Sequence, residues 1–483
     1  MNVALILRIV SVLLFMIACF MLIPAGVAWY YGEHAALAGF LLPILGAFAA
    51  ASLLFFLLRN ADRQLRPRDG FILVGLAWVS AAALGALPFR LSGTIPRYVD
   101  AFFETMSGFT TTGATILIDI EALPYSMLFW RSLTHWLGGM GIIVLTVAVF
   151  PLLGVGGLQL MKAEAPGPSV DKITPKVTET AKILWLIYLG LTVLQTTLLL
   201  LGGLDLFEAL THTFGTLATG GFSPRAASVG HYSSAYVHVV ITVFMILAGT
   251  NFFLYYKALT RQFSSVLRDT EWKSYLGVFA TASLVIALIL MRSGAYSGFG
   301  QSLRYAGFQA ASILTTTGYA TTDFALWPQA AQVVLFTLMF FGGCAGSTGG
   351  GIKIVRIVTL AKQAVHEMKY LLHPRGVFQI TFGGQPVRKN VLYAISGFVF
   401  LYLILLLLTS LVVASGGFGI ITSFTTALAT LGNIGPGFGR IGPSENYAFF
   451  QDYIKWYLSF IMMTGRLEVF TILVIFTPAF WRN

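Results

Sequence analysis

Long apolar runs recur along the whole chain, separated by short polar connections. A helix that spans a bilayer needs about 20 predominantly apolar residues. Ten stretches reach this length: 3–30, 36–58, 70–92, 124–153, 178–203, 235–257, 272–293, 328–360, 389–415 and 450–478. The pattern predicts an all-α integral membrane protein with about ten transmembrane helices.

Four shorter apolar segments lie between these spans, and each is too short to cross a bilayer. They cover residues 99–111, 205–217, 303–315 and 420–430. Each is followed by a polar stretch containing glycine, which is typical of a segment that enters the membrane and returns. We therefore expect four membrane-pore-membrane repeats around a pseudo-fourfold pore, preceded by an accessory helix pair. The expected units are 1–69 (accessory pair), 70–176 (repeat 1), 177–268 (repeat 2), 269–388 (repeat 3, with an intramembrane glycine-rich loop) and 389–483 (repeat 4).

The four polar stretches are candidates for a shared cation site. Non-helical backbone is tolerated at membrane depth only where it lines water or is buried in protein. Carbonyl oxygens turned toward a common axis can replace the hydration shell of a monovalent cation. The candidate residues are Thr111, Thr112 and Gly113, then Ala218, Thr219 and Gly220, then Thr316, Thr317 and Gly318, and finally Thr430, Leu431, Gly432 and Asn433. We assign Gly113, Gly220, Gly318 and Gly432 as equivalent positions, because glycine permits the positive φ that such a turn requires.

Composition supports the membrane assignment, and in a membrane protein the net positive charge indicates topology and not a binding partner. The chain is 57% hydrophobic and only 10% charged, whereas soluble domains carry about 25% charged residues. A net charge of +11 would favour nucleic acid as a partner for a soluble protein. Here the basic residues lie in alternate short loops, which predicts that those loops and both termini are cytoplasmic. The expected surroundings are a lipid bilayer, with no nucleic acid partner.

A glycine-rich run interrupts the eighth apolar stretch, at 342–351. Such a run breaks a helix, and at membrane depth a break is tolerated next to a pore. We interpret it as a gating loop, and a close-packing hinge is the alternative. The candidate gating residues are Gly346, Ser347, Thr348, Gly349, Gly350, Gly351, Lys353 and Arg466. Arg466 lies within the last apolar stretch, where a charge needs water or a partner. It is expected to form a positive barrier below the candidate cation site, coupled to the gating loop, or alternatively a structural ion pair.

With these motifs the sequence resembles the Trk/Ktr/HKT superfamily of cation transporters, and most closely its TrkH-type branch. The resemblance covers the whole chain, from the accessory pair through the four glycine-containing stretches. It implies potassium uptake across the bacterial cytoplasmic (inner) membrane through a gated selectivity filter. It also implies a homodimer that assembles with a cytosolic nucleotide-binding TrkA-type regulatory ring. Potassium would be the transported ion, with no organic cofactor and no enzymatic activity.

The four stretches are not identical, which leaves alternatives open. Ala218 stands where the other stretches have threonine, and Leu431 and Asn433 flank the fourth glycine. A less uniform ring predicts weaker discrimination against sodium, so a sodium-permeable relative is one alternative. The other is a proton- or sodium-coupled cation symporter.

Several polar residues near the short segments admit more than one interpretation. His135 and His212 are expected to pack or to hydrogen-bond rather than to relay protons. Four acidic residues could concentrate cations at the outer mouth, although helix N-terminal stabilisation explains two of them, Asp205 and Glu208, equally well. The four are Glu104, Asp205, Glu208 and Asp323.

Overall fold

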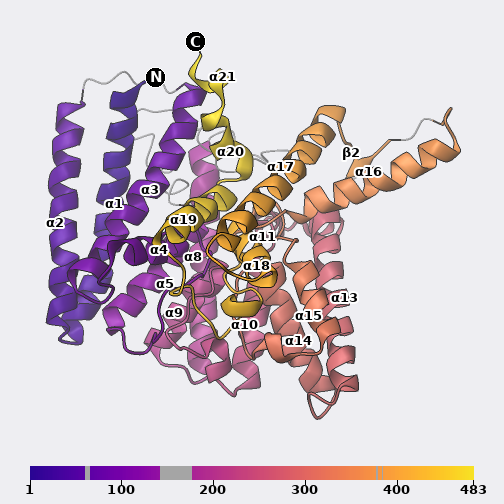
Figure 1. Cartoon of the computed structure of the whole chain (residues 1–483), viewed down its shortest axis with the longest axis horizontal. Helices are drawn as coiled ribbons and strands as arrows, with labels where there is room; N and C mark the ends of the chain where they lie inside the picture. The colour runs from indigo at the N-terminus through magenta and orange to yellow at the C-terminus, as the bar shows by residue number, and fades with distance from the viewer. Residues whose placement is uncertain (60–65, 142–176, 377–378, 383–384, 483) are drawn as a thin grey trace.

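The computed structural model describes residues 1–59, 66–141, 177–376, 379–382 and 385–482. The protein is almost entirely helical, and its helices are labelled from α1 at the N-terminus to α21 at the C-terminus (Figure 1). Within the described residues, six helices are long and apolar enough to cross a membrane. They are α1 (Val3–Tyr30), α2 (His34–Leu57), α3 (Pro67–Leu91), α8 (Val177–Leu201), α13 (Thr270–Arg292) and α17 (Lys389–Ala414). These six coincide with spans expected from the sequence.

The other expected spans are not single straight helices. The stretch 124–153 begins as α5 (Tyr125–Gly139), and its part beyond residue 141 lies outside the described residues. The stretch 328–360 is divided into α15 (Gln329–Leu338) and α16 (Ile354–Leu372), with the glycine-rich run between them. Figure 1 shows α16 projecting from the body of the molecule.

Two further spans are sharply bent, so the expectation of continuous helices there is wrong. The helices α10 (Ala235–Ala248) and α11 (Phe252–Leu259) meet at 95°. At this bend the Asn251 side chain accepts a hydrogen bond from the backbone N–H of Phe253, so it starts a new helix. Helix α19 (Asp452–Arg466) is followed at 118° by α20 (Val469–Leu473) and the 3-10 turn η4 (Val474–Phe476). Glu468 adopts a φ of +61°, which a continuous helix does not allow.

Four short helices occupy the middle of the protein, where the sequence places its short apolar segments. They are α4 (Tyr98–Phe109), α9 (Leu206–Leu217), α14 (Phe299–Leu314) and α18 (Ile420–Leu431). In α4 every residue from Ala101 to Phe109 is buried, and the C-terminal halves of the other three are likewise buried. The short helices therefore end inside the protein, whereas their N-terminal ends reach the surface.

The remaining elements are small. They are α12 (Phe263–Leu267), α21 (Pro478–Trp481), the 3-10 turns η1 (Ser228–His231), η2 (Phe324–Leu326) and η3 (Gly439–Ile441), and the strands β1 (Thr381–Phe382) and β2 (Gln385–Pro386). The two strands pair antiparallel, with Thr381 opposite Pro386.

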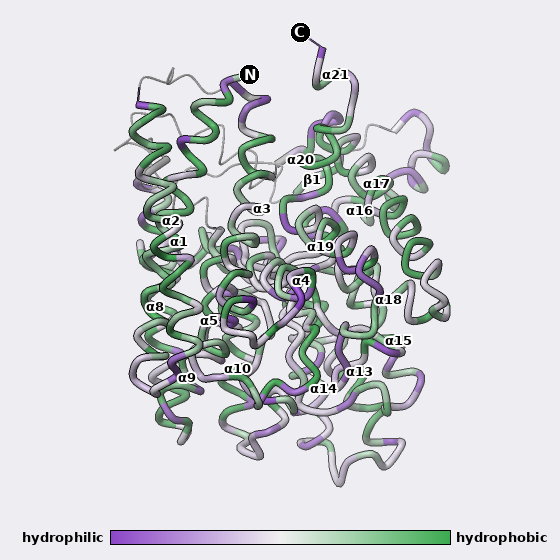
Figure 2. The backbone as a smooth tube through the Cα atoms, turned by 60° about the vertical axis from the view of Figure 1, so that its left-hand side comes forward, coloured by the Kyte–Doolittle hydropathy of each residue, from purple (hydrophilic) through white to green (hydrophobic). Residues whose placement is uncertain are grey.

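The outer surface of the long helices is apolar. In the most apolar 18-residue window of each long helix, only 28% to 50% of the residues are buried inside the protein. Figure 2 colours these helices mostly green, whereas purple, hydrophilic backbone occurs in the interior beside α4. An apolar exterior around a partly polar interior is the arrangement that a lipid solvent requires.

Two ion pairs with buried members join α4 to its neighbours. Arg131 on α5 and Glu104 on α4 are 2% and 1% exposed, and Arg131 Nε lies 2.8 Å from Glu104 Oε1. Lys455 on α19 is also buried, and its Nζ lies 2.6 Å from Asp100 Oδ1 on α4. Removing one member of a buried pair leaves an uncompensated charge, so both pairs tie α4 to its neighbours.

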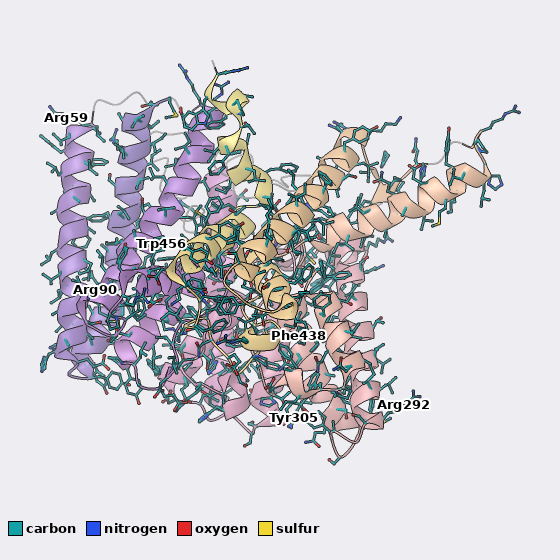
Figure 3. All side chains as sticks on the ribbon, in the orientation of Figure 1. Arg59, Arg90, Arg292, Tyr305, Phe438 and Trp456 are labelled. Carbon is teal, nitrogen blue, oxygen red and sulfur yellow. The ribbon has the colours of Figure 1, made fainter. Side chains whose placement is uncertain are left out.

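Both termini lie at the same end of the molecule (Figure 1). Asp69 at the start of α3 accepts a hydrogen bond from the backbone N–H of Asn2, so this carboxylate joins the starts of α1 and α3. In Figure 3, Arg59 lies toward the end that carries the termini, and Arg292 lies at the opposite end. The arginines thus mark the two ends of the helical bundle.

We expect close packing of α5 on α4 to be a principal source of stability. A Cβ on Gly138 would overlap the carbonyl oxygen of Phe109 and lie 2.7 Å from the carbonyl carbon. Gly138→Ala should therefore destabilise the fold by about 1–3 kcal/mol, as overpacking does. Gly190→Ala on α8 is the matched control, because a Cβ there meets nothing within 4 Å. Thermal unfolding in detergent measures both, and equal midpoints would contradict the packing argument.

Candidate functional site

Four non-helical segments, which we call the turn segments, follow the four short helices. They are residues 110–113, 218–221, 315–318 and 432–435. All four share one backbone pattern, with positive φ at the second and fourth residues. The second residues are Thr111 (+52°), Thr219 (+54°), Thr316 (+60°) and Asn433 (+53°), and the fourth are Gly113 (+79°), Gly221 (+80°), Gly318 (+84°) and Gly435 (+92°). The second residues are not glycine, so the surrounding protein holds them in this costly conformation.

The fourth residue of each turn segment faces a carbonyl oxygen of the next segment. A Cβ on Gly113 would overlap the Gly220 oxygen, one on Gly221 the Thr317 oxygen, and one on Gly318 the Ile434 oxygen. The series closes at Gly435, where a Cβ would lie 2.6 Å from the Thr112 oxygen. Segments far apart in sequence therefore form a closed ring, in which the third residue of each supplies a carbonyl and the fourth must be glycine.

This geometry corrects two of the four glycine assignments made from the sequence. In the second segment the left-handed glycine is Gly221, not Gly220. In the fourth it is Gly435, because Gly432 only caps α18 with a φ of −81°. The helix α18 continues through Leu431, so Thr430 and Leu431 belong to the helix end rather than to the ring. The physical reason is that α18 continues through Leu431. The Thr-Leu-Gly pattern therefore marks the end of this helix and not a left-handed turn.

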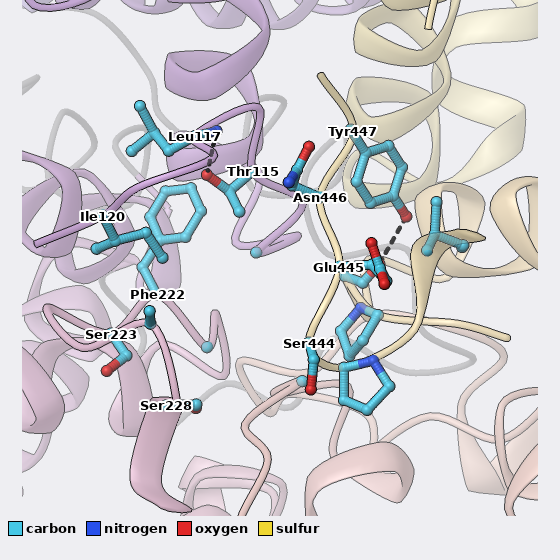
Figure 4. Close-up of a pocket in the computed structure, with 18 of the residues that line it drawn as sticks. Thr115, Leu117, Ile120, Phe222, Ser223, Ser228, Ser444, Glu445, Asn446 and Tyr447 are labelled. Atoms are coloured by element: carbon cyan, nitrogen blue, oxygen red, sulfur yellow. Dashed lines mark hydrogen bonds between the residues drawn. The ribbon is translucent and has the colours of Figure 1, made fainter. Parts of the chain in front are cut away.

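A pocket of about 110 Å³ opens on one side of the ring. All four left-handed glycines line it, together with Thr115, Phe222 and Tyr447 (Figure 4). The Tyr447 hydroxyl donates a 2.6 Å hydrogen bond to the Gly435 carbonyl, which is drawn as a dashed line. The pocket also meets the charged residues Arg131, Arg225 and Glu445. It is thus a polar vestibule that leads directly to the ring.

The side chains behind the ring differ among the segments. In the first segment the Thr110 and Thr112 hydroxyls are 2.8 Å apart, and in the third the Thr315 and Thr317 hydroxyls are 2.7 Å apart. In the fourth, Asn433 Nδ2 donates to Thr112 Oγ1 and to the Met462 carbonyl, each at 2.9 Å. The second segment has no such hydroxyl pair, because it carries Ala218 and Gly220 at these places.

The glycine-rich loop, residues 339–353, lies against the other end of the turn segments. The backbone N–H of Gly350 donates to Thr316 Oγ1 at 2.7 Å, and a Cβ on Gly349 would lie 3.0 Å from the Thr315 carbonyl. The Thr348 hydroxyl donates to the carbonyl of Leu217, the last residue of α9, at 3.0 Å. The loop therefore lies at the end of the ring away from the pocket.

Arg466 and Lys353 hold this loop in place. Arg466 Nη1 donates to the Thr348 carbonyl at 2.5 Å, while its Nη2 donates to the carbonyls of Gly138 and Gly139 at 2.7 and 2.9 Å. Lys353 Nζ donates to the Gly349 carbonyl. One guanidinium thus connects the loop, α19 and the end of α5.

The other candidate loop residues shape the chain rather than reach the ring. Ser347 donates its hydroxyl to the Cys344 carbonyl at 2.6 Å. Gly346 and Gly351 adopt φ values of +72° and +64°, and the Gly346 carbonyl accepts a hydrogen bond from Phe252 at the start of α11. These contacts join the loop to the bend between α10 and α11.

Sequence reasoning missed Glu271, which joins the two ends of the loop. Its Oε1 accepts from the backbone N–H of Ala345 at 2.8 Å and from that of Val355 at 3.1 Å. Glu271 is only 6% exposed. The available signal was an acidic residue at the start of an apolar span, which is also typical of ordinary N-terminal stabilisation of a helix.

The four acidic residues noted in the sequence have specific partners. Glu104 pairs with Arg131, and Glu208 lies 2.5 Å from Arg225 Nη2. This hydrogen bond to Glu208 raises the pKa of the Arg225 guanidinium. Asp205 caps α9 through the Glu208 N–H, and Asp323 caps η2. The structure thus uses these carboxylates in caps and ion pairs.

The chemistry of the site is that of neutral oxygen ligands around an axis. Carbonyl oxygens suit a weakly hydrated monovalent cation. Within the described part of the chain, no group of three or more His, Cys, Asp or Glu side chains is placed to bind a metal ion. Backbone carbonyls of the four turn segments, and not a cluster of ionisable side chains, therefore make up the ring between the pocket and the loop.

Comparison with known proteins agrees with this geometry. The chain matches the TrkH family model, described as a cation transport protein, over residues 40–297 and 296–483. It is 41% identical over 479 residues to the Trk system potassium uptake protein TrkH of Escherichia coli K12, covering 99% of each chain. It is 38% identical over 486 residues to the TrkH protein of Halomonas elongata, covering 100% of each.

A solved structure is also similar. The crystal structure of the potassium transporter TrkH from Vibrio parahaemolyticus superposes with a TM-score of 0.88 at 37% identity, and the match covers 100% of both chains. The matched family consists of membrane cation transporters and not of enzymes. From its family match and its full-length relatives, the chain belongs to the TrkH family of cation transport proteins.

Proposed function

We propose that this protein is the potassium-translocating subunit of a Trk-type uptake system in a bacterial inner membrane. The single observation that carries the proposal is the closed ring, in which each turn segment presents a carbonyl to a glycine of the next. Carbonyl oxygens at such close quarters replace the hydration shell of potassium. The names of the relatives, which are potassium uptake proteins, support the same ion.

The arrangement of the short helices supports a preference for cations. Each short helix ends where a turn segment begins, for example α4 at Phe109 directly before Thr110. The C-terminal end of a helix carries partial negative charge. Four such ends directed at one ring favour a cation and disfavour an anion.

We propose that four membrane-pore-membrane repeats build the pore after an N-terminal accessory pair, with boundaries at residues 70, 177, 269 and 389. In this proposal the ten crossings put both termini in the cytoplasm. The ring residues of the filter are then Thr112, Gly220, Thr317 and Ile434 with their following glycines, and the flanking candidates Ala218, Thr430 and Leu431 support the helix ends.

The glycine-rich loop is proposed as the gate. It lies at the end of the ring away from the pocket, and Arg466 donates to its Thr348 carbonyl. A guanidinium beside a cation path repels cations while it holds the loop through carbonyls. Displacement of the loop would therefore both open the path and release Arg466.

The proposed assembly is a homodimer with a cytosolic nucleotide-binding TrkA-type ring. The projecting helix α16 supports it, because its Leu371 and Leu372 side chains are 79% and 77% exposed. Exposed apolar side chains at the end of a projecting helix favour contact with another protein surface. The name of the relatives, a Trk system protein, supports an assembly of more than one subunit.

Uptake does not require a coupling ion in this proposal. One cation moving down an inside-negative potential gains about 2.3 kcal/mol per 100 mV. We therefore expect purified protein in liposomes with a negative interior to take up potassium and rubidium in preference to sodium. Protein-free liposomes are the control. Equal uptake of sodium would contradict potassium selectivity and favour the sodium-permeable alternative, and uptake driven by a proton or sodium gradient at zero potential would favour a symporter.

The ring predicts a specific role for Gly113. Gly113→Ser should lower the ratio of rubidium to sodium uptake several-fold, because the new Cβ would overlap the Gly220 carbonyl and displace it. Gly93→Ser is the matched control, since Gly93 has nearly the same φ, +78° against +79°, but nothing lies within 4 Å of its Cβ position. A ratio that falls equally in both variants would show that backbone strain alone is responsible and would refute the ring.

The gate predicts that Arg466→Ala raises basal rubidium uptake while leaving the rubidium-to-sodium ratio nearly unchanged. The substitution removes hydrogen bonds to Thr348, Gly138 and Gly139, whereas the ring carbonyls remain in place. Arg466→Lys should give an intermediate rate, because an ammonium cannot reproduce the planar fork of a guanidinium. Arg292→Ala, at the exposed end of α13, is the surface control. Uptake at or below the parent rate in Arg466→Ala, at equal protein incorporation, would mean that this loop is not a gate.

A further inference from the structure

The second turn segment lacks the side chains that support the first and the third from behind. The third residue is Thr112 in the first segment and Thr317 in the third, and each hydroxyl pairs with the threonine two residues before it. In the second segment the corresponding residues are Gly220 and Ala218. A glycine that carries a ring carbonyl would be poorly supported unless another part of the protein fills the space beside it.

The imidazole of His135, on α5, fills this space. A Cβ on Gly220 would overlap His135 Nδ1 and lie 2.5 Å from Cε1 and Cγ of the same ring. Gly220 has no positive φ, so its backbone conformation would accept another residue. Glycine is required at position 220 because His135 occupies the side-chain position, and not because of the turn itself.

His135 belongs to a stripe along α5 that follows the second turn segment. Arg131, His135 and Gly139 lie four residues apart and therefore on one face of the helix. Arg131 donates to the Ser223 carbonyl at 3.2 Å, and a Cβ on Gly139 would lie 2.7 Å from Ala218 Cα. The stripe thus contacts the chain from residue 218 to residue 223.

Phe222 packs against the imidazole of His135 as well. The His135 and Phe222 rings stack with centroids 4.1 Å apart and planes inclined by 14°. The Arg131 guanidinium carbon also lies 4.1 Å from the Phe222 centroid. Phe222 directly follows the ring glycine Gly221, so this stack is joined to the ring by one peptide bond.

The imidazole supports the segment through its shape. His135 is 0% exposed, and neither of its ring nitrogens has a hydrogen-bond partner among the described residues. Its contacts are instead the Gly220 backbone and the Phe222 ring. A flat side chain packed directly against a filter residue controls where the carbonyl of that residue can move.

We propose that His135 is a specificity-determining positioning residue, whose ring replaces the missing threonine of the second turn segment and holds the Gly220 carbonyl in the ring. The inference rests on the proposed potassium pore and adds to it that one quarter of the filter is completed by a helix from the preceding repeat. His135 touches the filter backbone and not the ion.

An exchange of volumes between His135 and Gly220 tests this proposal. His135→Ala should lower the rubidium-to-sodium uptake ratio several-fold, because it leaves a void behind Gly220. Gly220→Thr should lower uptake strongly, because the new side chain would overlap the imidazole. The double variant, His135→Ala with Gly220→Thr, places threonine as in the first and third segments, and should have a higher ratio than His135→Ala and more uptake than Gly220→Thr. Such non-additivity identifies residues that share one space.

Leu133→Ala is the control for loss of packing, since Leu133 is a buried residue of α5 outside the stripe. It should lower the thermal midpoint while keeping the parent ratio. The inference is overturned if His135→Ala keeps the parent ratio, or if Leu133→Ala lowers the ratio equally. If His135→Ala does not fold, the uptake of the double variant decides: uptake no higher than that of Gly220→Thr overturns the inference. A parent protein without preference for rubidium over sodium would refute the proposed function itself, so the two failures are distinguishable.

Discussion

The close approach of each turn-segment glycine to a carbonyl of the next segment is the constraint on which the rest of the structure depends. Any side chain at Gly113, Gly221, Gly318 or Gly435 would occupy the position of a neighbouring oxygen or crowd it. The buried C-terminal ends of the four short helices bring these residues together inside a bundle of long apolar helices. The non-helical backbone of the ring is tolerated because it is enclosed in protein and opens to a polar pocket.

Paired charges hold the helices that carry this ring. Glu104 and Asp100, both on α4, pair with Arg131 on α5 and Lys455 on α19. Glu104 also accepts from the Ile116 N–H at 2.9 Å, so the chain that leaves the first turn segment is fixed by the same carboxylate. Because losing one partner would leave a buried charge, these pairs specify how α4 sits against α5 and α19. The positions of the ring carbonyls follow from that arrangement.

The sequence predicts a helix well where an apolar run is clearly long or clearly short. It predicts bends and turns less well, because a single residue determines where each of them occurs. Six long helices and the four short helices agree with their expected ranges within a few residues. The bends at Asn251 and Glu468 were missed, because an apolar window does not reveal a side-chain cap or a left-handed residue. In the second turn segment two glycines are adjacent, so the sequence alone does not tell whether Gly220 or Gly221 is the left-handed one. Gly432 follows its threonine at nearly the same spacing as the glycines of the other stretches, but it caps α18. The ring glycine of this segment is Gly435.

The helix α5 connects the ring with Arg466, the residue that holds the loop, because positions one helical turn apart contact each of them. His135 packs on Gly220 at the ring, while Gly138 and Gly139, one turn further, offer their carbonyls to Arg466. Gly139 also lies against Ala218, at the start of the second turn segment. Arg466 therefore contacts the same helix that packs against Gly220, one turn away along α5. The third segment has a different connection, the hydrogen bond from Gly350 to Thr316. The four non-identical segments of this single chain are therefore joined to the loop by different contacts, which four identical subunits would not provide.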